Sequence, residues 1–188
     1  MTTRGFFGRR PSKEAAQRLP PGQYQTQDFP VLSMGPTPRV DLASWTWAEF
    51  EALPRTTWRG DIHCVTKWSK FDTVWEGVTI DDVLAAAGIE PPAGYLLAES
   101  HDGYDTNLPV ADLVGGRAMI ATRYGGAPVP AEHGGPARLL VPHLYFWKSA
   151  KWVKGLRFTP RDEAGFWEQR GYHMYGDPWR EQRYTNDP

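Results

Sequence analysis

Glycine and proline recur often along this sequence, which limits how long any helix can be. The 188 residues include 19 Gly and 17 Pro, and both residue types end helices and favour turns. Aromatic residues make up 13% of the chain, and large rings pack well in sheets and against rigid loops. We therefore expect one strand-rich domain, the usual outcome for a chain of this length, and not a helical bundle.

Short helices are expected at a few positions only. Thr46 and Glu49 have the spacing of a capping box, which predicts a short helix after Thr46. Thr79 and Gly88 are suited to begin and end a second helix. A third, short helix is expected within residues 109–114.

Strands are expected to outnumber helices. The pair Gly125-Gly126 predicts a hairpin turn. Strands and helices do not alternate regularly, so we predict an α+β fold with mixed β-sheets and short helices. The segments with strand composition, each bounded by Gly or Pro, are residues 57–65, 95–99, 117–124, 137–141 and 152–158.

The two ends of the chain differ from its middle. Residues 1–23 are rich in basic side chains, and we expect a solvated basic arm there, followed by the folded domain over residues 24–188. The segment after Pro160 is polar but carries many aromatic rings. Because a free, disordered tail holds few aromatic residues, we expect this segment to pack on the domain.

Charge and hydropathy exclude two classes of protein. Lys and Arg number 21 against 22 Asp and Glu, a net charge of -1, which excludes a globally basic nucleic-acid-binding protein. No stretch approaches the roughly 18 apolar residues of a membrane helix. Arg9-Arg10 is not followed by the apolar segment of an export signal. We therefore predict a cytoplasmic protein without a membrane span.

Cys64, the single cysteine of the chain, is a first candidate functional residue. It excludes an internal disulfide and a zinc site made of several thiolates. Cys64 lies at the end of the predicted strand 57–65, and the neighbouring His63 and Lys67 would favour its thiolate form. The alternatives are a small buried side chain, a metal-free thiol enzyme that uses Cys64 with His63, and a metal ligand. A metal at this thiolate would need further ligands from elsewhere, for instance from an organic cofactor.

A second group of candidates suggests a phosphate site. Arg138 offers a planar fork for an anion, and Lys148 and Lys151 add positive charge. Gly134-Gly135 would let backbone amides approach the same anion. The alternative reading is an ordinary turn followed by solvated lysines.

Three separated segments, in this order, resemble the molybdopterin-binding domain of the sulfite oxidase family. They are residues 63–69, which contain Cys64, residues 132–142 and residues 148–153. The resemblance spans about residues 27–184 and is strongest to the small, heme-free bacterial members. It implies the sulfite-oxidase-type fold and a molybdenum-molybdopterin cofactor (Mo-MPT), in which a pterin dithiolene and one protein cysteine hold the metal.

The resemblance also implies roles for individual residues. Cys64 takes the place of the cysteine that binds the metal, so it is the expected metal ligand and a catalytic residue. Tyr172, within Arg170-Gly171-Tyr172, takes the place of the active-site tyrosine. The residues expected to contact the cofactor are Cys64, Ser100, His133, Arg138, Lys148, Ser149, Ala150 and Lys151.

Two departures from the family pattern concern the substrate. Gln27 stands where eukaryotic sulfite oxidases have a sulfite-binding arginine. Lys67, Trp68 and Lys70 replace the paired arginines that follow the ligand cysteine in those enzymes. The resemblance therefore does not extend to sulfite recognition.

The implied activity is two-electron oxygen-atom transfer on a small sulfur or nitrogen oxo substrate, in either direction, with an electron-transfer partner of unknown identity. The alternative is a non-catalytic protein that binds or carries molybdopterin. A chain of this length has no room for the heme domain or the dimerisation domain of larger relatives. We therefore expect a heme-free monomer.

Overall fold

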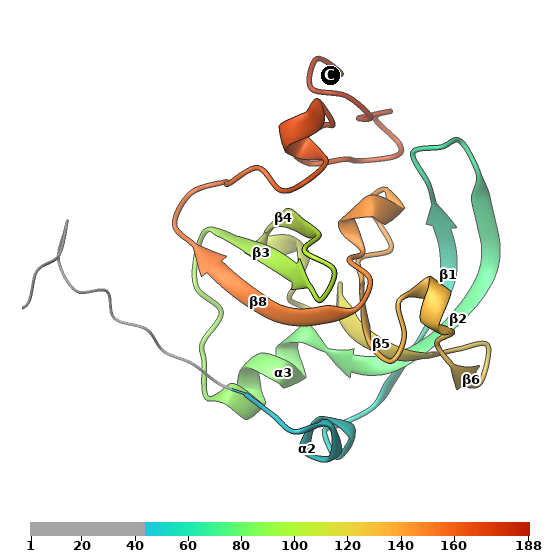
Figure 1. Ribbon diagram of the computed structural model, residues 1–188, viewed down its shortest axis with the longest axis vertical. Coiled ribbons are helices and arrows are strands. Elements are labelled where there is room, and N and C mark those ends of the chain that lie inside the picture. Colours follow the sequence, from blue (N-terminus) through green and yellow to red (C-terminus); the bar gives the residue numbers. More distant parts are fainter. Residues whose placement is uncertain (1–43) are drawn as a thin grey trace, which may run out of the picture. The chain divides into compact units, whose positions relative to one another are not determined.

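A computed structural model describes residues 44–188 of the chain (Figure 1). The predicted basic arm, Gln27 and the first residues of the predicted domain lie outside this range. The described residues belong to one compact unit, Ala43–Pro188. Within it, no helix is long and apolar enough to cross a membrane.

Both capped helices form where the sequence predicts them. Helix α2 (Trp47–Glu51) begins with a complete capping box, in which the Glu49 amide donates to the Thr46 hydroxyl and the Glu49 carboxylate accepts from the Thr46 amide. Helix α3 (Ile80–Ala87) is capped at its start by the Thr79 side chain. It ends at Gly88, whose φ of 67° is the left-handed conformation that glycine adopts without strain.

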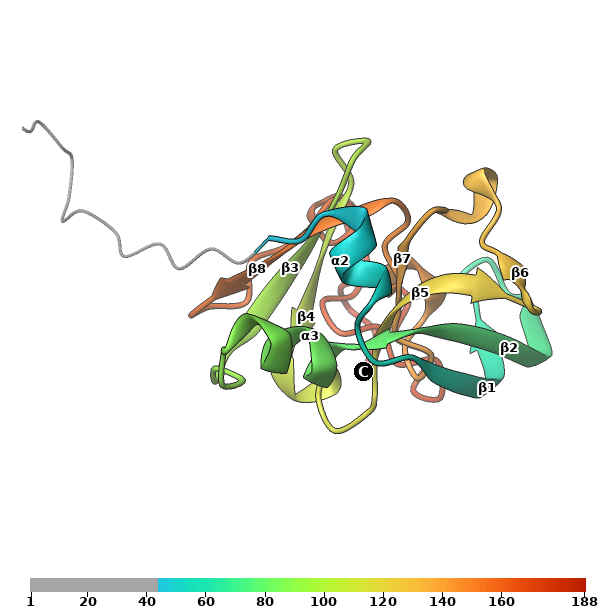
Figure 2. The ribbon, with the colours of Figure 1, turned by 90° about the horizontal axis from the view of Figure 1, so that it is seen from below.

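The strands form two antiparallel sheets, which lie on opposite sides of the view in Figure 2. The first has the order β1-β2-β5-β6, with β7 also paired to β5, and the second has the order β4-β3-β8. Every strand pair recorded in residues 44–188 is antiparallel, a narrower arrangement than the mixed sheets expected, within the α+β class that the sequence predicts. The strands are β1 (Thr56–His63), β2 (Ser69–Thr79), β3 (Tyr95–Ser100), β4 (Asp105–Pro109), β5 (Met119–Tyr124), β6 (Ala127–Pro128), β7 (Arg138–Leu140) and β8 (Val153–Thr159).

The five predicted strands correspond to β1, β3, β5, β7 and β8, and Gly125-Gly126 forms the expected two-residue turn between β5 and β6. The sequence does not predict β2 or β4. The outer half of β2 is exposed and charged, and the middle of β4 holds the buried polar residues Thr106 and Asn107. Neither strand therefore shows a simple apolar pattern. The helix expected within 109–114 is a single 3₁₀ turn, η1 (Val110–Asp112).

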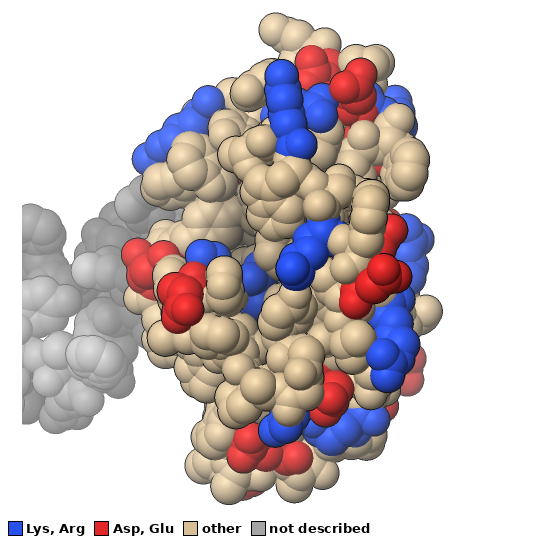
Figure 3. Space-filling view, turned by 90° about the vertical axis from the view of Figure 1, so that its right-hand side faces the viewer, with Lys and Arg blue, Asp and Glu red and all other residues tan. Residues whose placement is uncertain are grey.

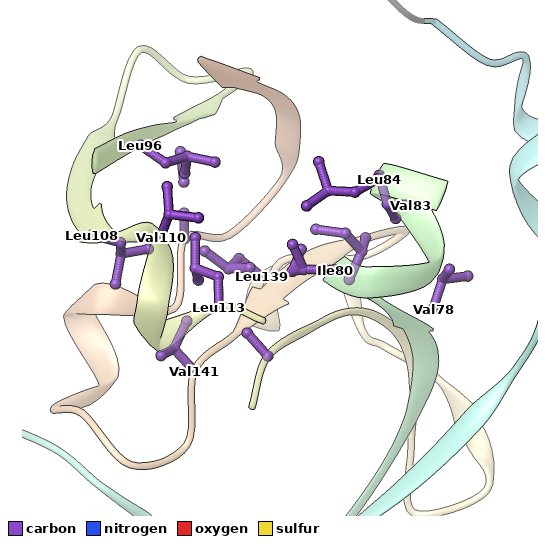
Figure 4. Close-up of a cluster of buried hydrophobic side chains, with 14 of the residues drawn as sticks. Val78, Ile80, Val83, Leu84, Leu96, Leu108, Val110, Leu113, Leu139 and Val141 are labelled. Carbon is purple, nitrogen blue, oxygen red and sulfur yellow. The ribbon is translucent and has the colours of Figure 1, made fainter. Parts of the chain in front are cut away.

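The main core lies between α3 and strands of both sheets (Figure 4). A second, smaller core lies on the other face of the first sheet, around Trp75 and Ile62. Strand β7 joins the two, because successive side chains of a strand point to opposite faces. Leu139 belongs to the main core, whereas Leu140 belongs to the second, and Arg138 shares the face of Leu140. The side chains labelled in Figure 4 are Val78, Ile80, Val83, Leu84, Leu96, Leu108, Val110, Leu113, Leu139 and Val141.

The C-terminal segment packs on the domain through its rings, as expected. It contains a further 3₁₀ turn, η4 (Glu168–Arg170). The ring of Phe166 lies 5.9 Å from that of Tyr104, and the ring of Tyr172 lies 5.2 Å from that of Trp147. In Figure 1 this segment is the red part of the chain, beside the outer end of the β1–β2 hairpin.

Truncation of Leu139 should expose how much the fold depends on β7. This side chain is fully buried, so Leu139→Ala leaves a cavity and should lower the free energy of unfolding by about 2–5 kcal/mol. Phe71→Ala, which removes a ring that is 67% exposed, should change it by no more than about 0.5 kcal/mol. Urea unfolding of the two variants and the parent measures both values. Equal effects would contradict the placement of β7 in the core.

Candidate functional site

Cys64 lies at the first position after β1, in the turn that joins β1 to β2. Its amide donates to the Trp68 carbonyl at 2.8 Å, and its carbonyl accepts from the Lys67 amide at 3.0 Å, so the turn is closed by its own backbone. The Thr66 hydroxyl donates to the Cys64 Sγ at 3.1 Å. A hydroxyl donor stabilises a thiolate, which is the form that binds metals.

The neighbouring His63 does not contact the thiol. Its Nδ1 forms a hydrogen bond with the Ser69 hydroxyl at 2.8 Å, and its ring lies 5.7 Å from that of Trp179. A thiol enzyme would need a base bonded to Cys64, and no such bond is recorded in residues 44–188. This part of the chain also has no group of three His, Cys, Asp or Glu side chains that could hold a metal ion. A metal bound at Cys64 would therefore take most of its ligands from a non-protein group.

A cavity of about 230 Å³ lies next to the Cys64 turn. The ring of Trp68, which belongs to that turn, packs 6.2 Å from the ring of Phe146, and Phe146 lines the cavity. Phe146 belongs to the 3₁₀ turn η3 (Phe146–Lys148). The residues lining the cavity are Asp102, Tyr104, Arg138, Phe146, Trp147, Ser149, Lys151, Trp152 and Trp167.

Arg138 provides a buried positive charge at this cavity. Its side chain is 1% exposed, and its guanidinium donates to the carbonyls of His133 and Ser149, both at 2.7 Å. The guanidinium also lies 4.1 Å from the centre of the Phe146 ring. Burial lowers the pKa of Arg138 to about 9, so the group is still protonated at neutral pH.

Arg138 has no carboxylate partner among the described residues. A buried charge is costly unless an opposite charge compensates it. A bound anion in the cavity would supply that charge. On the surface shown in Figure 3, by contrast, Lys and Arg are interspersed with Asp and Glu, so this face offers no extended basic field.

The Gly134-Gly135 pair lets the loop before β7 approach Lys151 closely. The carbonyl of Gly134 accepts from the Trp152 amide at 3.1 Å. A Cβ on Gly134 would lie 2.8 Å from the Cα of Lys151, and the φ of 102° also favours glycine there. The Lys151 ammonium donates to the Glu132 carbonyl at 2.7 Å, which holds it at the cavity.

Ala150 is held by β7 through its backbone, and Ser149 is held by the residue after β7 through its hydroxyl. The carbonyl of Ala150 accepts from the Leu139 amide at 2.8 Å, and the Ser149 hydroxyl accepts from the Val141 amide at 2.9 Å. Both residues are buried. Together with Arg138 and Lys151, Ser149 lines the cavity, so the structure brings these three predicted site residues together.

Lys148, an expected cofactor contact, is not among the residues that line this cavity. Lys148 is 0% exposed, and its ammonium donates to Glu168 Oε1 at 2.6 Å, to the carbonyl and Oδ1 of Asn107 and to the carbonyl of Met174. Burial lowers the pKa of Lys148, and the Glu168 carboxylate opposes that shift. All the donor capacity of Lys148 is used within the protein, and Glu168 neutralises its charge.

Ser100 and His133 lie at the edges of the same region. Ser100 is 1% exposed, and its hydroxyl has no hydrogen-bond partner among the described residues. Its amide donates to the carbonyl of Tyr104, which lines the cavity. Buried hydroxyls are rarely left without a partner, so this one fits a bound group. The imidazole of His133 is exposed, and the recorded contact of this residue with Arg138 is through its carbonyl.

Tyr172 lies behind the aromatic wall of the cavity. Its ring packs at 5.2 Å against Trp147 and at 5.0 Å against Trp167, and both tryptophans line the cavity. This wall is the part of the site that sequence reasoning missed. Trp147 flanks the predicted lysine segment, and Trp167 precedes Tyr172 by five residues. Their closeness in sequence to the predicted site residues could have indicated that they belong to the site.

The residues present therefore fit an anionic organic group with a soft metal. Arg138, a buried guanidinium without a carboxylate partner in the described range, lines the cavity, whereas Cys64, a half-buried thiol with a hydroxyl donor, and Ser100, a buried hydroxyl without a partner there, are not among its lining residues. Thiolates select soft or high-valent metals, and a planar guanidinium suits phosphate.

Comparison with known proteins agrees with this chemistry. Residues 35–167 match the protein family described as "Oxidoreductase molybdopterin binding domain". The chain is 41% identical to the uncharacterized oxidoreductase YuiH of Bacillus subtilis, over 97% of this chain and 100% of that protein. It is also 29% identical to a putative protein-methionine-sulfoxide reductase subunit, YedZ1, of Azospira oryzae, over 72% of this chain and 52% of that protein.

More distant similarities reach larger enzymes. The chain is 28% identical to human mitochondrial sulfite oxidase over 52% of its own length and 20% of that protein. The structure of the sulfane dehydrogenase SoxCD from Paracoccus pantotrophus matches with a TM-score of 0.53 and 25% identity, over 60% of this chain and 33% of that one. This chain thus belongs to the family of oxidoreductases with a molybdopterin-binding domain, as the resemblance to the sulfite oxidase family implies.

Proposed function

We propose that this protein is a Mo-MPT enzyme that catalyses two-electron oxygen-atom transfer on a small sulfur or nitrogen oxo compound, which either gains an oxygen atom and loses two electrons or loses an oxygen atom and gains two electrons. The observation that carries the proposal is the buried Arg138 cation, which has no carboxylate partner in the described range and lines a cavity beside the Cys64 turn. A bound anion would compensate the charge of such a cation, and the family to which the chain belongs is described as having a molybdopterin-binding domain.

The residues that would hold the cofactor follow from these contacts. Arg138 and Lys151 would bind its phosphate, with Ser149 and Ala150 beside them. Ser100 and His133 would add hydrogen bonds at the edges, and Cys64 would bind the metal. When bound, the cofactor supplies the two-electron redox chemistry, and the protein supplies binding, orientation and electrostatics.

The side chains of this chain have distinct tasks in that scheme. The Thr66 hydroxyl, bonded to Sγ, would stabilise the thiolate of Cys64. Trp147 and Trp167 would exclude water from the cavity, which strengthens the attraction between Arg138 and an anion. Tyr172 is the candidate hydrogen-bond donor to the substrate by its place in the family motif, and since its ring packs on both tryptophans and does not line the cavity, this role would require it to reach the substrate past them.

The relatives bear on the substrate without fixing it. One is named as a putative methionine-sulfoxide reductase subunit and others as sulfite oxidases. This chain spans about half of the former and a fifth of the latter. A small oxo compound of sulfur or nitrogen covers both chemistries. We also propose a heme-free, cytoplasmic monomer that exchanges electrons with a separate partner.

Replacement of the candidate metal ligand tests the proposal. Cys64→Ser should retain the fold, because it exchanges a half-buried sulfur for an oxygen of similar size, and it should abolish turnover since a hydroxyl is a poor ligand for a soft metal. Thr66→Val, which removes only the hydroxyl donor to Sγ, should retain part of the activity. Sulfite, methionine sulfoxide and other S- and N-oxides are assayed with artificial electron carriers on protein of measured molybdenum content.

Two results of this assay would count against an enzyme of this kind. Full activity of Cys64→Ser would remove Cys64 from the mechanism. A parent protein that holds molybdenum and pterin, but whose metal redox state does not change with any substrate, would instead be a cofactor-binding or carrier protein.

A second prediction concerns the two hydrogen-bond donors of the Arg138 guanidinium. Arg138→Lys retains the charge, but one ammonium cannot reproduce the two parallel bonds to the His133 and Ser149 carbonyls while facing an anion. The molybdenum and pterin retained after purification should fall about tenfold, equivalent to about 1.4 kcal/mol of binding free energy. Arg123→Lys, on the exposed side of β5 beside Glu76, should leave loading unchanged. Equal loading of both variants would show that Arg138 does not bind the cofactor.

A further inference from the structure

Lys148 and Glu168 form an ion pair with no exposure to solvent. Both side chains are 0% exposed, and Lys148 Nζ lies 2.6 Å from Glu168 Oε1. The ammonium also donates to Asn107 Oδ1 and to the Met174 carbonyl, each at 2.7 Å, and to the Asn107 carbonyl at 3.0 Å. The pair therefore connects β4, η3 and η4 with the chain that follows η4.

Glu168 bonds a residue of the cavity wall with the same oxygen. Its Oε1 accepts from the Trp147 indole Nε1 at 2.8 Å and from the Thr106 hydroxyl at 3.1 Å, in addition to Lys148. Its Oε2 is buried without a partner among residues 44–188. Glu168 Oε1 thus holds the indole of Trp147, whereas Oε2 accepts no hydrogen bond from the described residues.

The orientation of Trp147 determines the shape of the cavity wall. The Trp147 ring lines the cavity and is stacked on Tyr145, with ring centres 5.4 Å apart. Its edge meets the ring of Tyr172 at an interplanar angle of 86°. The Tyr104 hydroxyl donates to the Trp147 carbonyl at 2.6 Å, so the backbone of this residue is held independently of the indole.

Stability alone is a weak reason for such a pair. Removing two ions from water is costly, and well-packed apolar residues of similar volume often stabilise a protein as much as a buried ion pair. A buried charged pair does, however, impose fixed hydrogen-bond directions, which apolar side chains do not.

We propose that Lys148 and Glu168 are positioning residues that orient the indole of Trp147, and through it Tyr172, at the cavity. Neither residue touches the cavity space itself. The inference rests on the proposed function only in treating this cavity as the cofactor and substrate site. The geometry that it describes belongs to the protein without a cofactor.

The test separates orientation from stability. Lys148→Met/Glu168→Leu replaces both charges by apolar side chains of similar size, so no uncompensated charge stays buried, but Trp147, Thr106 and Asn107 lose a hydrogen-bond partner. Its Tm should therefore fall, by less than that of Lys148→Met. Lys148→Met alone leaves a buried carboxylate without its ion-pair partner and should lower the Tm clearly. Arg157→Met/Glu99→Leu, which removes an exposed pair between β8 and β3, is the matched control.

The direct readout is the indole N–H of Trp147 in the metal-free protein. It is identified in ¹⁵N NMR spectra by its loss in Trp147→Phe, and its exchange with solvent is then measured in each variant. Exchange is measured at a temperature well below the Tm of every variant, where we expect at least a tenfold faster exchange in Lys148→Met/Glu168→Leu and no change in the control. Glu168→Gln retains an oxygen acceptor and should restore slow exchange. An unchanged Trp147 signal in Lys148→Met/Glu168→Leu would overturn the proposal.

A second variant covers the case in which the double variant does not fold. Glu168→Leu alone removes the acceptor and should show fast indole exchange, whereas Glu168→Gln at the same position should not. Equal exchange in these two variants would also overturn the proposal.

The cofactor-loaded protein provides an independent comparison. If the parent contains molybdenum and turns over substrate, the double variant should lose at least tenfold in kcat/KM and the Arg157→Met/Glu99→Leu control should not. Unchanged kcat/KM in the double variant, with fast indole exchange, would overturn the functional part of the inference. A parent without molybdenum would reject the proposed function but leave the indole result to decide the orientation of Trp147.

Discussion

The guanidinium of Arg138 is the contact on which the rest of the candidate site depends. It joins the loop before β7, through the His133 carbonyl, to the chain after η3, through the Ser149 carbonyl. These two segments supply Lys151, Ser149 and the glycine pair. Backbone hydrogen bonds at Gly134 and Ala150 also connect the two segments, but the Arg138 guanidinium is the side chain that bonds to both. The same group carries the charge that would attract the cofactor, so the geometry and the electrostatics of the site depend on one side chain.

Strand β7 explains how such a charge can be buried. Its three residues alternate between two cores, which places Leu139 in the main core and Arg138 beside Leu140 in the second. The second core contains aromatic rings, and the guanidinium lies over Phe146 at 4.1 Å and over Trp75 at 5.5 Å. Cation–π contacts offset part of the cost of desolvation. An aromatic core thus tolerates a cation where an aliphatic one would not.

The sequence predicts the parts of this structure that local patterns determine. Caps at Thr46 and Thr79, the turn at Gly125-Gly126 and the position of Cys64 at the end of a strand all depend on neighbouring residues. Strand β4 could not be predicted, because its buried positions are polar and are satisfied by residues some 60 positions away, such as Glu168. The partner of Lys148 is 20 residues away and has no recognisable spacing. Pairings of this kind are set by the tertiary fold, which single-sequence patterns do not contain.

Arg138 and Lys148 differ in their partners because the tertiary fold, and not the local sequence, determines which groups lie beside each cation. Both cations are buried, both lie in segments that resemble a phosphate site, and local sequence gives no reason to separate them. The fold places a carboxylate beside Lys148 and only carbonyls and rings beside Arg138. Carbonyl oxygens satisfy hydrogen bonds but cancel no net charge, so under the proposed function Arg138 would attract an anion more strongly than Lys148, whose charge Glu168 neutralises. In a chain of net charge -1, the affinity of a site for an anion is therefore decided by which cation lacks a buried carboxylate, and not by how many cations a motif contains.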